Sequence, residues 1–314
     1  MTASLQPLNM GGILDRAIQI LRARFTLFAG IAVFPGLAQL VWQLLSVHPN
    51  PGIATIASDG QTAFESARYG ASFVFSVASL VLQAIATAAS CLAASRVYFG
   101  DSITIRSAFG TFTSKAGRLV GLEILRGIYA GWPLMIAAFV AVVIGELGGS
   151  IYLQVPVWIL GSIPCLALYS RYALAFPACA IENLSAPSAI DRSVNLSQGG
   201  RWRICGGFVF PGTAAAVFTY SLIWLIARLK TGSPFLAGSP FVVAGLNGIV
   251  SFIGDLVFVP LSAIVLTVLY YDQRIRREGY DVERMMDAAG MTAPGVSLAS
   301  DSPIASAAPE EVQP

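Results

Sequence analysis

Charged residues are scarce in this chain of 314 residues. Asp, Glu, Lys and Arg together make up 11% of it, while apolar residues make up 55% and the mean hydropathy is +0.70. An ordinary soluble domain carries about 25% charged residues, and so few charges could not cover this much apolar surface in water. The net charge of +2 is too small to indicate a nucleic-acid partner. We therefore expect that membrane lipids surround most of the chain.

Residue types that carry catalysis or bind metals are also scarce. The chain has a single histidine, His48, and its four cysteines lie in apolar runs without C-x-x-C spacing. The sequence contains no G-x-x-x-x-G-K, H-E-x-x-H or G-x-S-x-G motif. We expect the cysteines to be small buried apolar residues, and we expect no metal, no cofactor and no catalytic group.

Long apolar runs dominate what is present. A helix that crosses the hydrocarbon core needs about 20 apolar residues, and six stretches qualify: 26–47, 70–95, 119–144, 152–180, 204–227 and 241–271. The fold class predicted is therefore an all-α polytopic membrane protein, with prolines that kink the crossings rather than break them. We expect a membrane domain over residues 1–286 and a disordered tail over 287–314, which is rich in Ala, Ser and Pro.

The distribution of Lys and Arg predicts the orientation. With both termini in the cytoplasm, fourteen of the 19 Lys and Arg residues fall in cytoplasmic segments, and Arg68, Arg228 and Lys230 fall outside. Such an excess of positive charge marks the cytoplasmic side. We therefore expect a protein of the cytoplasmic (inner) membrane with both termini in the cytoplasm.

An internal repeat is visible at an offset of 176 residues. The segment Leu14–Gly36 aligns with Ile190–Gly212 without a gap, and both end in Phe-Pro-Gly. A degenerate third copy, Ser107–Gly121, lies between them, with Arg118 in the place of Arg203. This predicts three units, each with a short amphipathic helix followed by a membrane hairpin, over about 10–97, 103–182 and 187–280.

The short helix that opens each unit is expected to lie in the headgroup layer. In the first unit Ile13, Ala17 and Leu21 recur on one helical face, and Asp15 and Arg22 lie on the other. The arginines at these interfaces either fix the topology only or contact lipid headgroups. The candidate headgroup contacts are Arg16, Arg22, Arg24, Arg118, Arg192, Arg201, Arg203, Arg274, Arg276 and Arg277.

Ionisable residues also fall inside the predicted crossings: Glu123, Arg126, Arg171 and Asp255. Charges at this depth are costly unless they pair, reach the interface or line a wet cavity. Glu123 and Arg126 share one helix face at i, i+3. Asp255 has no partner nearby in the sequence, so we expect it to pair with Arg171 from another helix. A structural pair and a polar path or headgroup site both fit this pattern.

Three segments resemble the glycerophosphoryl diester phosphodiesterase membrane-domain family: ILDRAIQILRARF, RYALAFPACAIENLSAPSAIDRSVNLSQGGRWRI and YYDQRIRREGYDVERM. The resemblance covers about residues 10–286. It implies a six-helix membrane domain, which in that family is sometimes fused to a soluble phosphodiesterase. Many members lack that enzyme, and this chain has neither the histidines nor the room for it.

The sequence thus leaves three functions open. The first is a non-catalytic membrane module in lipid or envelope homeostasis, or an anchor or scaffold for a protein partner. The second is a carrier or channel for a small or amphiphilic solute, which the repeats, the prolines and the intramembrane charges favour. The third is a membrane-embedded enzyme that acts on lipid headgroups.

Overall fold

The computed structural model of the protein describes residues 8–47, 58–113, 115–148 and 150–279. Within these ranges, six helices are long and apolar enough to cross a membrane, which confirms the all-α polytopic membrane fold. The predicted tail 287–314 and His48 lie outside the described residues. The long helices are α2 (Phe25–Leu45), α3 (Ser58–Tyr98), α5 (Ala116–Glu146), α6 (Ile151–Tyr172), α9 (Arg201–Gly232) and α11 (Pro240–Glu278).

Proline affects these helices in two ways. Most of the prolines expected in crossings lie inside continuous helices: Pro35 in α2, Pro133 in α5, Pro211 in α9 and Pro260 in α11. Pro177 differs, because the predicted crossing 152–180 is divided there into α6 and the short helix α7 (Ala175–Ile181). Pro177 falls in the first turn of α7, where a backbone N–H has no helical partner to lose.

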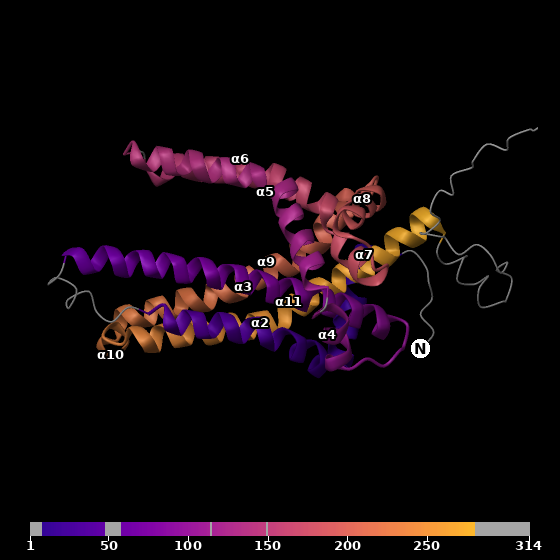
Figure 1. The fold of residues 1–314 in the computed structure, drawn as a ribbon, viewed down its shortest axis with the longest axis horizontal. Helices are drawn as coiled ribbons and strands as arrows, with labels where there is room; N and C mark the ends of the chain where they lie inside the picture. The colour runs from indigo at the N-terminus through magenta and orange to yellow at the C-terminus, as the bar shows by residue number, and fades with distance from the viewer. Residues whose placement is uncertain (1–7, 48–57, 114, 149, 280–314) are drawn as a thin grey trace, which may run out of the picture.

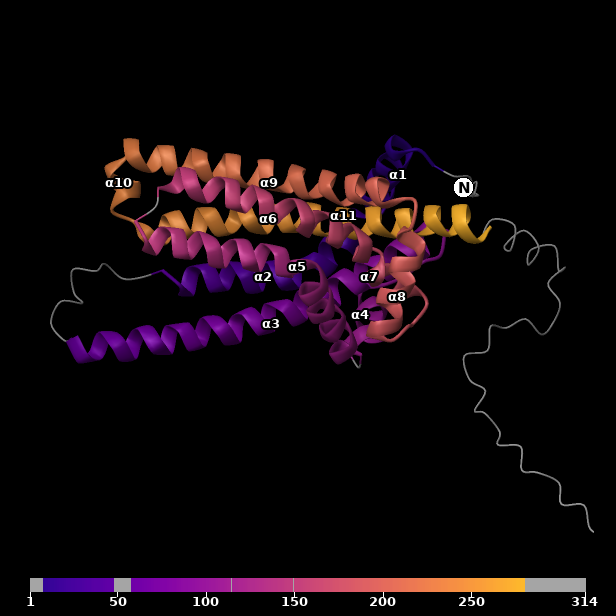
Figure 2. The ribbon, with the colours of Figure 1, turned by 90° about the horizontal axis from the view of Figure 1, so that it is seen from above.

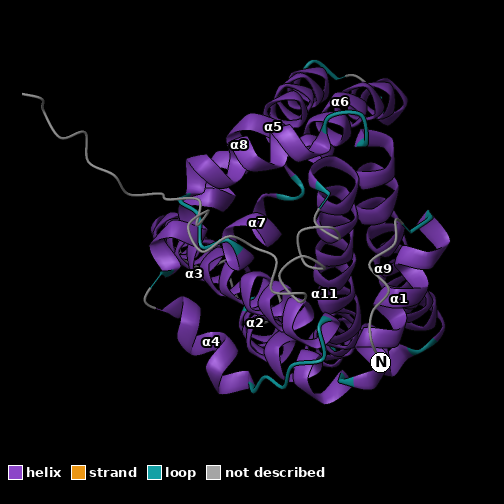
Figure 3. Ribbon diagram, turned by 90° about the vertical axis from the view of Figure 1, so that its right-hand side faces the viewer, coloured by secondary structure: helices purple, strands orange, loops and turns teal. Residues whose placement is uncertain are grey.

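Short helices gather at one end of the molecule. These are α1 (Met10–Ala23), α4 (Ile105–Thr113), α7 and α8 (Ala186–Ser197), and Figure 3 looks onto the end that they form. They surround the last turns of α3 and α11 and the first turns of α2, α5 and α9. We call this region the packed end. The hairpin tips, including α10 (Pro234–Ala237), lie at the opposite end of the long axis (Figure 1), which we call the open end.

Burial differs sharply between the two ends. The core lies at the packed end, where Ile13, Phe28, Leu119, Phe176 and Tyr270 are each almost fully buried. Towards the open end the long helices expose large apolar side chains, among them Phe73, Phe139, Leu160, Val217 and Phe241. Exposed apolar surface on this scale is what a lipid-facing helix presents.

The amphipathic helix α1 packs on protein, so the expectation that its apolar face lies in the headgroup layer is wrong. Asn9 caps the helix by accepting a 2.7 Å hydrogen bond from the Gly12 N–H. Ile13 and Ala17 are 0% exposed, because α1 packs against α11 and α9. An apolar stripe at helical spacing is the same whether lipid or protein covers it, so the sequence pattern could not decide between the two.

The long helices form a closed ring (Figure 3). Within each hairpin, α2 contacts α3, α5 contacts α6, and α9 contacts α11. Between hairpins, the second helix of each packs on the first helix of the next: α3 on α5, α6 on α9, and α11 on α2. The hairpin α5/α6 is set apart from the other long helices over most of its length (Figure 1).

Two helix starts recur at the offset of 176 residues. α8 begins at Ala186 and α9 at Arg201, each 176 residues after the starts of α1 and α2. Ser95 and Tyr271, which are also 176 residues apart, hydrogen-bond to each other through their hydroxyls at 2.6 Å. A short helix precedes each hairpin. The organisation of the chain as three repeats stays a prediction.

Candidate functional site

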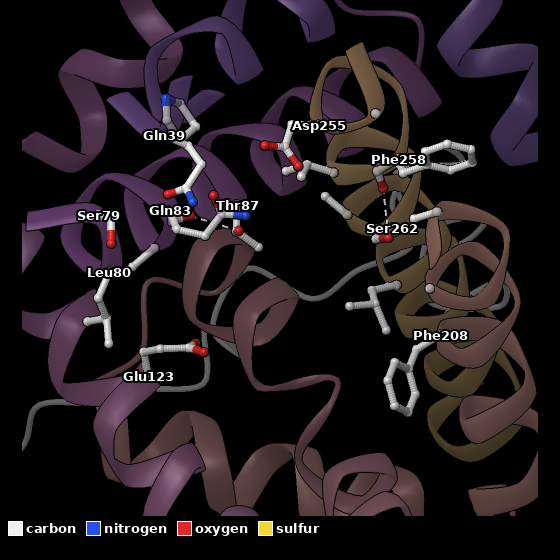
Figure 4. A pocket seen from close by; sticks show the side chains of 18 of the residues that line it. Gln39, Ser79, Leu80, Gln83, Thr87, Glu123, Phe208, Asp255, Phe258 and Ser262 are labelled. Atoms are coloured by element: carbon white, nitrogen blue, oxygen red, sulfur yellow. Dashed lines mark hydrogen bonds between the residues drawn. The ribbon is translucent and has the colours of Figure 1, made fainter. Parts of the chain in front are cut away.

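A cavity of about 770 Å³ lies inside the ring, partly open to its surroundings. All of the ring helices contribute to its wall, and the side chains around it are shown in Figure 4. Much of the wall is apolar, but polar and charged groups also face the space. These are Gln39, Ser76, Ser79, Gln83, Thr87, Glu123, Arg126, Tyr169, Thr219, Asp255 and Ser262.

One face of α3 supplies a polar track along the cavity. Ser76, Ser79, Gln83 and Thr87 follow at i, i+3, i+7 and i+11, which places them on a single helical face. At 1.5 Å per residue the track is about 16 Å long, or roughly half the thickness of a bilayer's hydrocarbon core. A row of hydroxyl and amide groups of this length gives a polar solute a series of hydrogen-bonding positions at membrane depth.

Residues at the offset of 176 lie on both sides of this space. Ser79 of α3 and Asp255 of α11 both line the cavity and lie 176 residues apart, as do Gln39 of α2 and Ala215 of α9. The matched positions differ in chemistry, so the wall carries a carboxylate on one side and a hydroxyl on the other.

Asp255 is half-buried in α11 and has neither a hydrogen bond nor an ion pair among the residues that the structure describes. α2 approaches α11 closely at this level, since a Cβ placed on Gly36 of α2 would lie 2.9 Å from the Phe252 ring and 3.8 Å from the Asp255 Cβ. Insertion scales put an uncompensated charge at the centre of a membrane helix at about 2.5–3.5 kcal/mol. Asp255 therefore lowers the stability of the empty fold, which is typical of a functional residue rather than a structural one.

Glu123 and Arg126 form the ion pair that their spacing predicts. The Arg126 Nη2 donates to the Glu123 Oε1 at 2.8 Å, and the guanidinium lies over the rings of Tyr169 and Phe176 at 4.6 and 4.8 Å. Arg126 is only 7% exposed, yet its Nε has no hydrogen-bond acceptor among the described residues. Two aromatic faces and one carboxylate thus compensate this charge in part and leave a buried donor in the cavity wall.

The predicted pair between Arg171 and Asp255 does not form, so that expectation is wrong. Arg171 lies at the packed end, where its backbone oxygen accepts a 2.9 Å hydrogen bond from Ser193 of α8. Its guanidinium lies over the ring of Tyr172. About 22 Å of helix separate Asp255 from Tyr270 at the packed end. The sequence placed both residues inside crossings, but it could not show that they lie at different depths.

Asp272 organises one polar cluster at the packed end. Asp272 is 3% exposed. Its carboxylate accepts hydrogen bonds from the Leu8 N–H at 2.9 Å, from Arg203 at 3.0 Å and from Arg276 at 3.0 Å. Both arginines also donate to the Leu8 carbonyl, at 2.7 and 2.9 Å. The cluster connects the residues just before α1 to the last turns of α11, although these segments are far apart in the chain.

Glu182 organises a second polar cluster there. It accepts hydrogen bonds from Arg192 and from the Tyr270 hydroxyl, and Arg192 also donates to Glu278. Arg274 lies 3.7 Å from Glu182 and 3.2 Å from Glu278. Burial lowers the pKa of Arg192, but its hydrogen bonds to Glu278 and Glu182 outweigh that effect and raise the pKa overall.

Most of the arginines expected at lipid headgroups are engaged with the protein instead. Besides the arginines of the two clusters, Arg118 donates to Asn183 at 2.9 Å and Arg277 donates to the Gln198 carbonyl. Arg16 lies over the ring of Tyr98 at 5.4 Å. Three of the expected arginines are exposed and make no hydrogen bond or ion pair in the described part of the chain: Arg22, Arg24 and Arg201.

No family model, curated protein or solved structure matches this chain. In the residues that the structure covers, no group of three or more His, Cys, Asp or Glu side chains could hold a metal ion. The four cysteines are free thiols, and three of them are buried, as expected for small apolar residues. The cavity is therefore the feature of the structure that bears most directly on function.

The polar residues of the cavity were the part that sequence reasoning missed. Gln39 and Gln83 interrupt apolar runs, but only ionisable residues were considered as candidate membrane sites. A search for any amide or hydroxyl that recurs on one face of a crossing would have found the α3 track. Asp272 and Arg276 have the i, i+4 spacing of a helical ion pair. The contacts of Asp272 with Arg203 and of Glu182 with Tyr270 had no such signal, because these residues lie far apart in the sequence.

Proposed function

We propose that the protein is a non-catalytic integral membrane module that binds a membrane lipid in its cavity and acts in lipid or envelope homeostasis. The observation that carries this proposal is the cavity itself, which has a mixed apolar and polar wall between membrane-spanning helices. Its volume of about 770 Å³ is in the range of sites that bind small organic molecules. An amphiphile matches such a wall, since its chain can contact the apolar helices and its polar group the α3 track. The proposal agrees with the family resemblance.

A carrier for a small or amphiphilic solute is the second candidate. It is favoured by Asp255, a carboxylate at membrane depth that has no protein partner among the described residues. Charged residues of this kind often mark substrate or ion pathways. The two functions differ in outcome, because a carrier releases its ligand on both sides of the membrane and a lipid-binding module does not need to.

Native mass spectrometry of the purified protein tests lipid binding. We expect a lipid to remain bound, and we expect Gly212→Phe to remove it. Gly212 lines the cavity, and a Cβ there meets nothing within 4 Å, so the added ring extends into open space. Gly127→Phe in α5 is the matched control, since Gly127 has the same free space but does not line the cavity. Equal lipid retention by both variants would contradict the proposal.

We further propose that the protein resides in the cytoplasmic membrane with its packed end, and both termini, in the cytoplasm. The charge distribution supports this orientation, because Arg and Lys concentrate at the packed end. In a cysteine-free background, Thr231→Cys at the open end should react with an impermeant maleimide in intact cells. Ser102→Cys, which is exposed between α3 and α4, should react only after lysis. The reverse pattern would overturn the orientation.

A further inference from the structure

Three side chains in the cavity have unused hydrogen-bonding capacity. Asp255 of α11, Gln39 of α2 and Gln83 of α3 all line the space, and no side-chain hydrogen bond or ion pair engages any of them within the described residues. They come from three different helices. Gln39 follows Gly36 by one helical turn, and a Cβ on Gly36 would lie 3.8 Å from the Asp255 Cβ. Figure 4 shows Gln39 and Asp255 in the same upper part of the view. Polar groups held in this way at membrane depth are costly unless a ligand engages them.

The charge of these three side chains indicates which kind of ligand they would bind. Asp255 brings one negative charge, the two glutamines bring neutral amide oxygens, and the other carboxylate of the cavity, Glu123, is already paired with Arg126 at 2.8 Å. A positive ligand is therefore required beside Asp255. Amide and carboxylate oxygens accept hydrogen bonds, so a cation that carries N–H donors uses all three side chains.

We propose that Asp255, with Gln39 and Gln83, binds the ammonium group of an amine-bearing ligand in the cavity. The inference deepens the proposed function and rests on it, since it names the headgroup chemistry of the bound amphiphile. The ammonium group has two sources, the headgroup of an amine-bearing lipid and a small water-soluble amine. The apolar remainder of the wall, formed by residues such as Leu80, Phe208 and Phe258, favours the lipid.

The test compares two lipids with matched acyl chains, one headed by ethanolamine and one by choline. Both headgroups carry a positive nitrogen, but only the ethanolamine group donates N–H hydrogen bonds. Full-length protein is incubated with equimolar mixed vesicles, re-extracted and analysed by native mass spectrometry. We expect about tenfold preference for the ethanolamine lipid, the size of effect that hydrogen bonds to a charged group produce.

Variants test whether the preference for the ethanolamine lipid depends on Asp255. Asp255→Asn should keep the bound lipid but lose most of the preference, and Asp255→Glu should retain part of it. The matched control is Glu146→Gln, which removes one exposed carboxylate at the open end and should leave the preference unchanged. Thermal unfolding of each variant ensures that only folded protein is compared.

The outcomes distinguish failure of the ammonium site from failure of the proposed lipid-binding function. Bound lipid without headgroup preference, or a preference that survives Asp255→Asn, would overturn the ammonium site and leave lipid binding intact. No bound lipid and no binding of free ethanolamine by titration calorimetry would overturn both. Asp255-dependent binding of free ethanolamine without lipid retention would support the ammonium site, assign it to a soluble amine and overturn the lipid-binding function.

Discussion

Two aspartates on one helix show how the ends of the molecule differ. Asp272 and Asp255 both lie on α11, about 25 Å of helix rise apart. At the packed end Asp272 accepts from one backbone N–H and two arginines. In the cavity Asp255 has no partner among the described residues. The same side chain therefore stabilises the fold at one position and is left available at the other.

The difference extends to whole regions. At the packed end, carboxylates and carbonyls from other parts of the chain accept hydrogen bonds from the half-buried arginines Arg118, Arg192 and Arg203. Around the cavity, amides, hydroxyls and a carboxylate face an open space of about 770 Å³. Buried polar groups that are fully paired are typical of structural sites, and unpaired ones are typical of binding sites. Position in the fold, rather than residue type, thus separates structure from function in this protein.

The largest effect on stability is expected for Asp272→Asn. The change removes the charge that compensates Arg203 and Arg276 inside the packed end. Removing one partner of a buried ion pair costs about 3–5 kcal/mol, and we expect the lower end of this range because the side chains of Arg203 and Arg276 are 31% and 35% exposed. We expect a large fall in the midpoint of thermal unfolding in detergent, measured by circular dichroism. A midpoint equal to wild type would show that the packed end does not depend on this cluster.

A smaller but clear loss is expected for Gly161→Ala at the open end. A Cβ on Gly161 of α6 would lie 2.4 Å from the Ala137 Cβ and 3.1 Å from the Pro133 carbonyl of α5. Overpacking of this kind costs about 1–3 kcal/mol. Gly131→Ala in α5 is the control, because nothing lies within 4 Å of a Cβ there. A similar unfolding midpoint for the two variants would show that α5 and α6 do not pack this closely.

Two serines test the comparison at the level of single hydrogen bonds. Ser95→Ala removes the 2.6 Å bond to the buried Tyr271 hydroxyl and should cost about 0.5–1.5 kcal/mol. Ser79→Ala in the cavity removes a hydroxyl that bonds only to its own helix and should change stability by less than about 0.5 kcal/mol. Chemical denaturation of the two variants checks the order. A larger cost at Ser79 would reverse our assignment of the two regions.

No loss of stability is expected for Asp255→Asn. The change removes no described hydrogen bond or ion pair, so the unfolding midpoint should equal or exceed that of the wild type. The same substitution at Asp272 is the matched comparison. If Asp255→Asn destabilised the protein as much as Asp272→Asn, Asp255 would be a structural residue.

The sequence predicted local features well. Each of the six predicted crossings overlaps one of the six apolar spans in the described ranges, although α3 begins 12 residues earlier than predicted and the stretch 152–180 is divided into α6 and α7. The pair Glu123–Arg126 is also as expected. These features depend on residues within one helical turn or on the apolar length of a single segment, both of which are visible in a sequence.

Long-range features were not predictable. Whether the apolar face of α1 meets lipid or α11 depends on how the hairpins assemble, and so does the depth of Arg171 relative to Asp255. The cavity residues Gln39 and Gln83 share a cavity with Asp255 because α11 packs against both α2 and α3. A single sequence gives the period of a pattern but not the partner that its face meets.

The most direct test of the central claim is a cryo-electron microscopy map of the protein in lipid nanodiscs. The account predicts elongated density between α3 and α11, with its polar end within hydrogen-bonding distance of the Asp255 carboxylate. A map in which α5 and α6 close onto the other helices and side chains fill the space would contradict it.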